Sequence, residues 1–152
     1  MTGRRIVFAT FGSLGDLHPY VAVAQELARR GHRPLIATFE EFRENVEAAG
    51  VAFAPMRPGM ARFGDKTAIM ERLVDPRRGP EFLVRGMFMP HLRESYEDLL
   101  RACRGADLLV THPLALVGPL LAQKEGLRWA SSGLSPMTMF SAVDPSVFPA
   151  AS

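Results

Sequence analysis

Short runs of apolar residues alternate along the chain with segments in which apolar side chains recur every three to four positions. The runs are typical of strands buried on both faces, and the spaced pattern is typical of amphipathic helices. In the first third of the chain, the pattern predicts strands over residues 5–8, 34–38 and 51–55 and helices over residues 20–30 and 40–49. Gly31 and Gly50 follow the two helical patterns, where glycine commonly ends a helix. This order predicts parallel strands joined by right-handed crossovers.

The same alternation returns after an irregular segment. Residues 56–80 are interrupted by proline and glycine, with one short helix expected over residues 66–74. Beyond them the pattern predicts a helix over residues 82–104 that can kink at Pro90, a strand over 106–111, a helix over 116–125 and a strand over 128–132. Residues 137–152 are loop-like yet apolar, and we expect them to pack on the domain. The 152 residues therefore predict one α/β domain with a parallel sheet of five or more strands and helices on both faces.

The turn after the first strand combines glycines with polar side chains. Gly12 and Gly15 let the backbone turn sharply and approach a ligand, because glycine adopts a positive φ without a Cβ clash. Ser13, Asp16 and His18 stand beside them, close to a helix N-terminus whose free N–H groups favour negative charge. Ligands bind at the carboxyl ends of the strands in open α/β sheets. This turn is therefore the first candidate site.

Two functions fit Asp16. A carboxylate just ahead of a helix commonly caps it, and Pro19 suits the first helical turn, where its missing N–H has no partner to lose. The same carboxylate can take a proton from a substrate hydroxyl, since an aspartate is ordinarily ionised at neutral pH. The spacing alone leaves both functions open.

A longer motif surrounds this turn. Residues 10–19 read TFGSLGDLHP, residues 22–32 read AVAQELARRGH, and residues 36–38 read IAT. With this motif, residues 4–135 resemble the N-terminal domain of GT-B glycosyltransferases of the family 28 and family 1 types. The most similar members are sterol and lipid glucosyltransferase-like proteins and bacterial antibiotic glycosyltransferases. The resemblance implies a Rossmann-like three-layer domain.

The resemblance also implies roles for the residues of the turn. Asp16 falls where the family places its general base. Gly12, Ser13 and Gly15 would line the floor between the acceptor and the donor phosphates. His18 has no fixed role in the family; it could orient Asp16, contact the acceptor or cap the helix.

Two further candidates lie later in the chain. Met87 belongs to an unusually apolar segment, residues 82–89, which is either plain core or a wall of the acceptor pocket in which methionines adapt to shape. His112 follows the fourth expected strand, at the same edge of the sheet as Asp16. In the resembling family this turn borders the acceptor, so Met87 and His112 are candidate substrate contacts.

GT-B enzymes hold the acceptor mainly in a first domain and the nucleotide-sugar mainly in a second. Residues 1–152 resemble only the first, so we expect the donor-binding domain to be absent and this chain alone to be inactive. The complete enzyme would move a hexose, by default glucose from UDP-glucose, to a hydroxyl of a sterol, lipid or polyketide, with no further cofactor. A surface meant for the second domain would favour self-association.

Other functions stay open. The chain could be a non-catalytic module or partner subunit that binds a hydrophobic small molecule, with Asp16 only a cap. A phosphate-binding turn is disfavoured because residues 10–19 lack the lysine and glycine spacing of a phosphate loop, and the turn also lacks the Gly-x-Gly-x-x-Gly pattern of dinucleotide-binding proteins.

Composition narrows the remaining choices. Lys and Arg number 18 against 16 Asp and Glu, without a basic stripe, so nucleic acid is not an expected partner. A single cysteine, Cys103, excludes an intramolecular disulfide and a cysteine-based zinc site, and no other cluster has metal-ligand spacing. No stretch approaches the ~20 apolar residues of a membrane span. We therefore expect a cytoplasmic protein without a metal.

Overall fold

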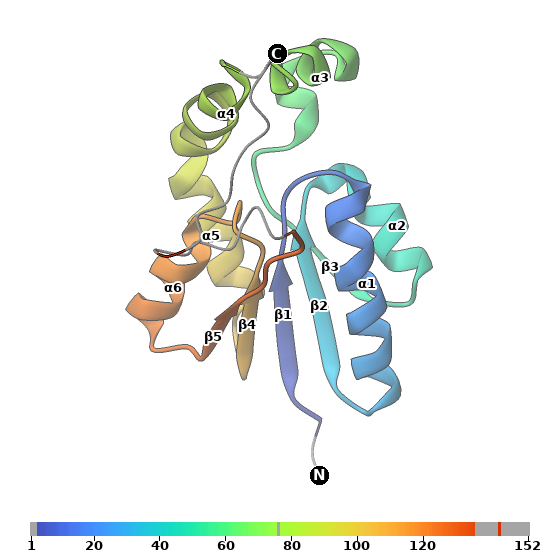
Figure 1. Cartoon of the computed structure of the whole chain (residues 1–152). Helices are drawn as coiled ribbons and strands as arrows, with labels where there is room; N and C mark the ends of the chain where they lie inside the picture. The colour runs from blue at the N-terminus through green and yellow to red at the C-terminus, as the bar shows by residue number, and fades with distance from the viewer. Residues whose placement is uncertain (1–2, 76, 136–142, 144–152) are drawn as a thin grey trace.

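The computed structural model describes residues 3–75, 77–135 and 143. Its centre is a parallel five-stranded sheet with the strand order β3-β2-β1-β4-β5 (Figure 1). The strands are β1 (Arg5–Ala9), β2 (Arg33–Thr38), β3 (Ala52–Pro55), β4 (Leu108–Thr111) and β5 (Trp129–Ser131). Each expected strand is present, and the predicted α/β Rossmann-like class is confirmed.

Helices cover both faces of this sheet (Figure 1). The α-helices are α1 (Leu14–Arg29), α2 (Arg43–Ala48), α3 (Lys66–Leu73), α4 (Gly79–Glu81), α5 (Leu92–Ala102) and α6 (Val117–Glu125). Shorter 3₁₀ segments are η1 (Glu40–Phe42), η2 (Met60–Phe63) and η4 (Met89–His91), and η3 (Phe82–Phe88) is a π-helix. The α1 and α2 helices lie on one side of the sheet and α5 and α6 on the other, while α3 and α4 stand beyond the carboxyl ends of the strands.

The central strand explains why the core has two halves. Val7 and Ala9 of β1 are fully buried against the α5 and α6 side, and Ile6 and Phe8 are buried against the α1 and α2 side. A strand covered on both faces has no solvent side, so its sequence is a continuous apolar run and not an alternation. That run is what made the strand predictable.

The first helix begins earlier than the sequence pattern indicated. We expected Pro19 in its first turn, but α1 begins at Leu14, with Ser13 as N-cap, and Pro19 lies inside it. The cap formed by Ser13 and Asp16 starts the helix. Pro19 therefore removes one internal hydrogen bond, the one that an N–H at this position would donate to the carbonyl of Gly15.

The helix expected over residues 82–104 is also different in detail. Helical backbone runs from α4 to α5, but η3 and η4 interrupt it, and Pro90 lies in η4. Pro90 has no N–H for the α-helical ladder, which is the physical reason for a change of helix type at this point. The expected packing of residues 137–152 concerns residues outside the described part, except Val143, which is exposed. None of the described helices has both the length and the apolar character needed to cross a bilayer.

Candidate functional site

A row of polar residues crosses the carboxyl edge of the sheet. Thr10 follows β1 and lies between Thr38, the last residue of β2, and His112, which follows β4. Ser132 follows β5 and lies beside His112. Backbone hydrogen bonds extend the strand ladders to these residues, including one of 2.9 Å from the His112 N–H to the Ala9 carbonyl. The parallel sheet thus gathers at one edge polar residues that are far apart in the sequence.

Asp16 reaches this edge from the first turn of α1. Its Oδ2 accepts hydrogen bonds from the Ser13 N–H (2.7 Å) and the Ser13 hydroxyl (3.0 Å), while the Ser13 Oγ accepts from the Gly15 N–H (3.2 Å). Ser13 and Asp16 together form a capping box. The structural function that the sequence allowed for Asp16 is therefore real, and it occupies one oxygen of the carboxylate.

The two glycines of the turn have different functions. Gly12 has a φ of +132°, and a Cβ at this position would lie 2.2 Å from the Asp16 Oδ2. Only glycine leaves room for the carboxylate to fold back over the backbone. Gly15 does not have the positive φ that we expected, because it lies inside α1 and donates its N–H to the cap.

His112 is the second predicted residue that lies beside Asp16. Its Nε2 is 3.5 Å from the Asp16 Oδ1, and the two side chains are 6% and 32% exposed, respectively. The His112 Nδ1 accepts a hydrogen bond of 3.2 Å from the Leu114 N–H. A neutral imidazole that accepts at Nδ1 carries its hydrogen on Nε2, so a donor faces the carboxylate.

Burial decides the charge state of His112. Desolvation lowers the pKa of His112, and the nearby Asp16 carboxylate opposes this shift without reversing it. The imidazole therefore remains neutral at neutral pH. The pair is a carboxylate beside a neutral donor, not a salt bridge.

Tyr20 and Ser132 complete the surroundings of His112, and sequence reasoning missed both. The Tyr20 hydroxyl lies 2.6 Å from the Ser132 Oγ, which donates to the Thr111 carbonyl at 3.1 Å, so Tyr20 is the donor of the first bond. The Tyr20 ring also meets His112 edge-on, with 6.4 Å between ring centroids. Burial raises the pKa of Tyr20. Ser132 could have been found from its place after a strand, as His112 was.

The remaining predicted site residues, His18 and Met87, lie apart from the pair formed by Asp16 and His112. His18 is exposed on α1, two positions after Asp16. Met87 is only 1% exposed, so its side chain lies in the interior and not on an open wall. Among the residues that the structure describes, no three His, Cys, Asp or Glu side chains form a group able to hold a metal.

A narrow apolar gap, too small to hold a water molecule, lies in the core near the two polar turns. Its walls come from the segments next to the two polar turns and from η3 and α5, and they consist of Phe11, Phe88, Leu92, Ser95, Leu114, Leu116 and Val117. Phe11 immediately precedes Gly12, and Leu114 donates its N–H to His112. The gap therefore lies next to the two turns, and Asp16 itself does not line it.

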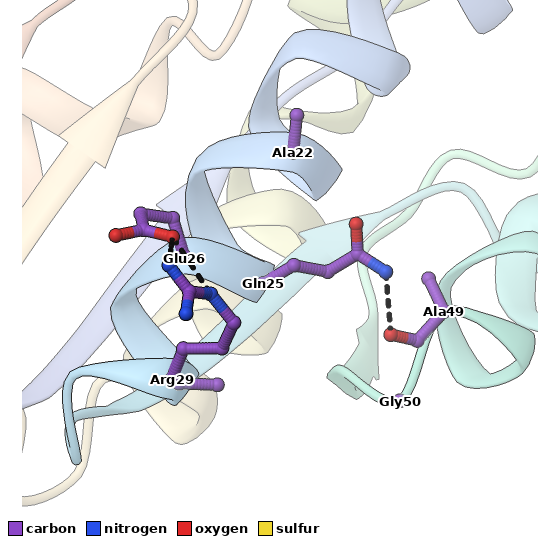
Figure 2. A pocket seen from close by; sticks show the side chains of 7 residues that line it. Ala22, Gln25, Glu26, Arg29, Ala49 and Gly50 are labelled. Carbon is purple, nitrogen blue, oxygen red and sulfur yellow. Dashed lines mark hydrogen bonds and ion pairs between the residues drawn. The ribbon is translucent and has the colours of Figure 1, made fainter.

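A more open groove lies elsewhere, between α1 and the end of α2 (Figure 2). Gln25 spans it with a hydrogen bond of 3.0 Å to the Ala49 carbonyl, and Glu26 pairs with Arg29 on its rim. These polar groups already satisfy one another. The groove therefore offers no group poised for chemistry.

Comparison with protein families gives one match that covers the first turn. The glycosyltransferase family 28 N-terminal domain matches residues 6–86. Asp16 falls inside the matched region, which ends within η3 (Phe82–Phe88).

Curated relatives agree with this match. A sterol 3-beta-glucosyltransferase of Neurospora crassa is 31% identical over 137 residues, which is 88% of this chain and 8% of the relative. A sterol 3-beta-glucosyltransferase of Sclerotinia sclerotiorum is 34% identical over 131 residues, or 78% of this chain and 8% of the relative. The chain thus spans less than a tenth of the length of these relatives.

Solved structures show the same architecture. The glycosyltransferase SnogD from Streptomyces nogalater is 27% identical with a TM-score of 0.65, covering 90% of this chain and 35% of SnogD. The Streptomyces sp. SF2575 glycosyltransferase SsfS6, solved with thymidine diphosphate, is 26% identical with a TM-score of 0.64, covering 84% of this chain and 38% of SsfS6.

Proposed function

Because this chain belongs to the glycosyltransferase family 28 N-terminal domain, we propose that it is the acceptor-binding part of a hexosyltransferase. The complete enzyme transfers a hexose, by default glucose from UDP-glucose, to a hydroxyl of a lipophilic molecule of the sterol, lipid or polyketide type. Sterol 3-beta-glucosyltransferases among the relatives support this acceptor class. A separate domain binds most of the nucleotide-sugar, so this chain alone does not turn over, and no metal or further cofactor takes part.

One observation carries the proposal: the cap engages one oxygen of the Asp16 carboxylate, Oδ2, and leaves the other, Oδ1, with only the His112 Nε2 nearby, at 3.5 Å, among the described residues. Both Ser13 donors engage Oδ2, whereas no hydrogen bond from a described residue reaches Oδ1. Capping and catalysis are therefore compatible, because the cap orients the carboxylate and leaves a lone pair for an acceptor hydroxyl.

The chemical step follows from that lone pair. The acceptor hydroxyl transfers its proton to the Asp16 Oδ1 while its oxygen attacks the anomeric carbon of the sugar. The bond from that carbon to the diphosphate oxygen breaks, and its electron pair leaves with the nucleoside diphosphate. A positioned general base contributes about 10²- to 10⁴-fold to such a step, and holding the hydroxyl in line adds to it.

The remaining site residues take supporting roles in this proposal. Gly12, Ser13 and Gly15 form the floor beneath the reacting hydroxyl. His18 is exposed at the same end of α1 and contacts the acceptor from the solvent side. Met87 contacts an acceptor only if the residues around it move apart, since its side chain is buried in the structure.

Calorimetric titration of this chain tests the proposal. UDP-glucose and a panel of lipophilic alcohols are titrated separately, and we expect the alcohols to bind and the nucleotide-sugar not to bind. Asp16→Asn is the matched control, since an acceptor domain keeps its acceptor affinity without the base. Nucleotide binding without alcohol binding would overturn the proposal and make the first turn a phosphate site. Alcohol binding by a full-length protein that never transfers sugar would indicate a non-catalytic binding module.

A further inference from the structure

His112 and Asp16 form a pair built from two elements that are distant in sequence. Asp16 lies in the first turn of α1, and His112 follows β4, yet their Nε2 and Oδ1 atoms are 3.5 Å apart. We propose that His112 is a positioning residue, whose neutral imidazole donates its Nε2–H toward Oδ1 and fixes the carboxylate for proton transfer. This inference builds on the proposed function of Asp16 as general base.

The hydrogen bonds of the ring make His112 a donor and not a second base. Its Nδ1 is occupied by the Leu114 N–H, and the hydrogen must then sit on Nε2. If the ring took up a second proton, that proton would sit on Nδ1 and would face the Leu114 N–H, so the hydrogen bond from Leu114 would be lost. The side chain is also 6% exposed, so an acceptor hydroxyl meets Asp16 and not His112.

The protein holds this imidazole from several sides. The backbone N–H of His112 donates to the Ala9 carbonyl and so extends the sheet ladder. The Tyr20 ring meets the imidazole edge-on. Tyr20 in turn is tied to Ser132 at 2.6 Å. A side chain locked in this way can orient its neighbour, because little of its own freedom remains to be lost.

The charge states of the residues around His112 also support its role as a hydrogen-bond donor to Asp16. Among the described residues, the titratable groups that face His112 are Asp16 and Tyr20, both from α1. Burial lowers the pKa of His112 and raises that of Tyr20, so both are neutral at neutral pH and the carboxylate is the one charge. The distance of 3.5 Å is slightly long for a hydrogen bond, and such contacts commonly shorten when substrate binds.

Kinetics of the full-length enzyme test the inference. His112→Leu removes the donor, and we expect kcat to fall about 10-fold with little change in KM, the value of one hydrogen bond to a charged group. The acid limb of the kcat/KM profile moves to higher pH, because a carboxylate that loses a donor takes up a proton more readily. His112→Gln keeps a donor near the Nε2 position and restores part of the rate.

A double-mutant cycle separates positioning from general damage. If His112 acts through Asp16, His112→Leu costs nothing further in the Asp16→Asn background. His32→Leu is the matched control, because the His32 Nδ1 also accepts a backbone N–H at 3.2 Å, from Arg4, at the opposite edge of the sheet. We expect this control to keep the wild-type rate.

The outcomes distinguish the two proposals. An inactive Asp16→Asn enzyme with an unchanged His112→Leu enzyme would overturn the positioning role and leave the base in place. An active Asp16→Asn enzyme would overturn the base itself. Equal losses from His112→Leu with and without Asp16 would show that His112 acts independently of the carboxylate.

A second measurement stands even where His112→Leu fails to fold. The His112 ring is titrated by nuclear magnetic resonance in this chain and in its Asp16→Asn variant. Since the Asp16 charge raises the pKa of His112 against the effect of burial, removing that charge lowers this pKa further. An unchanged His112 titration would contradict the pairing.

Discussion

Asp16 and Asp98 show two uses of the same side chain. Asp98, on α5, is 5% exposed and accepts hydrogen bonds from the Arg57 N–H (2.9 Å), Nε (2.7 Å) and Nη2 (2.8 Å), and it also pairs with Arg101. Asp16 is 32% exposed and accepts from Ser13 alone within the described part of the chain. Both accept a backbone N–H, but two guanidinium groups surround Asp98 and none contacts Asp16.

The two carboxylates differ in how many of their oxygens are already occupied by hydrogen bonds. Burial pushes the pKa of Asp98 up, but the hydrogen bonds from Arg57 outweigh burial, and the pKa ends below its usual range. Asp98 in turn raises the pKa of Arg57. Asp98 is thus fixed as an ion that joins the segment after β3 to α5, whereas the Asp16 Oδ1 accepts no hydrogen bond from a described residue. In the proposed function, the carboxylate that has no guanidinium partner among the described residues is the one that accepts the proton.

Breaking the Asp98 cluster gives the largest expected loss of stability. Asp98→Ala leaves the Arg57 N–H without its partner and removes a buried anion, and we expect the free energy of unfolding to fall by about 3 kcal/mol. Urea unfolding with an unchanged m-value measures it. Glu97→Ala is the control, since Glu97 is 52% exposed and 3.9 Å from Arg57, and such a pair contributes little. Similar losses from both variants would contradict the structural role of Asp98.

The variant Gly12→Ala tests whether the Asp16 carboxylate lies over the backbone of Gly12. The new Cβ would meet the Asp16 carboxylate at a positive φ, and we expect a loss of about 2 kcal/mol together with displacement of the carboxylate. Gly64→Ala is the matched control, because Gly64 also has a positive φ of +101° but no atom within 4 Å of the added Cβ. Chemical unfolding of both variants separates the clash from the backbone strain. Equal losses would mean that the Asp16 carboxylate does not lie over Gly12.

Ser13→Ala has a smaller effect on stability. It removes the hydroxyl that joins the Gly15 N–H to Asp16, and loss of such a cap costs about 1 kcal/mol. Thermal unfolding of this chain measures the loss. A variant as stable as the wild type would show that the Asp16 carboxylate caps α1 without help from Ser13.

The smallest expected effect is on the pH dependence of the free energy of unfolding, which should differ between the region of His112 and the region of Asp98. The pKa of His112 is lowered by folding, so its contribution is complete above about pH 6.5 and is lost as the pH falls through the lower folded value. Asp98 has a lowered carboxyl pKa, so its contribution is complete above about pH 4 and is lost only in stronger acid. Urea midpoints of the wild type and of His112→Leu at pH 7, 5.5 and 3.5 test this order. An identical change between pH 7 and 5.5 in both proteins would contradict the role given to His112.

Sequence reasoning succeeded where the signal was local. The strands were predictable because each is a short apolar run, and their shared direction then placed Asp16 and His112 at one edge. The start of α1 was missed because Pro19 suggested a first turn, although Ser13 and Asp16 carry the capping pattern three residues apart. Here the competing signals were both in the sequence, and the cap determined the helix start.

Other features depend on contacts that no local pattern records. The Leu114 N–H that fixes the tautomer of His112, and the edge of Tyr20 against its ring, require the packed sheet and helix. The ion pair between Arg57 and Asp98 joins two residues that are 41 positions apart in the sequence.

The most direct test of the central claim is the turnover number of Asp16→Asn in the full-length enzyme at saturating acceptor and donor. The amide oxygen of an asparagine can still accept the Ser13 N–H of the capping box, so we expect the melting temperature to stay close to that of the wild type. We predict that kcat falls about 100-fold or more, the range for loss of a general base. A normally folded variant that turns over at close to the wild-type rate would contradict the account and leave Asp16 as a helix cap alone.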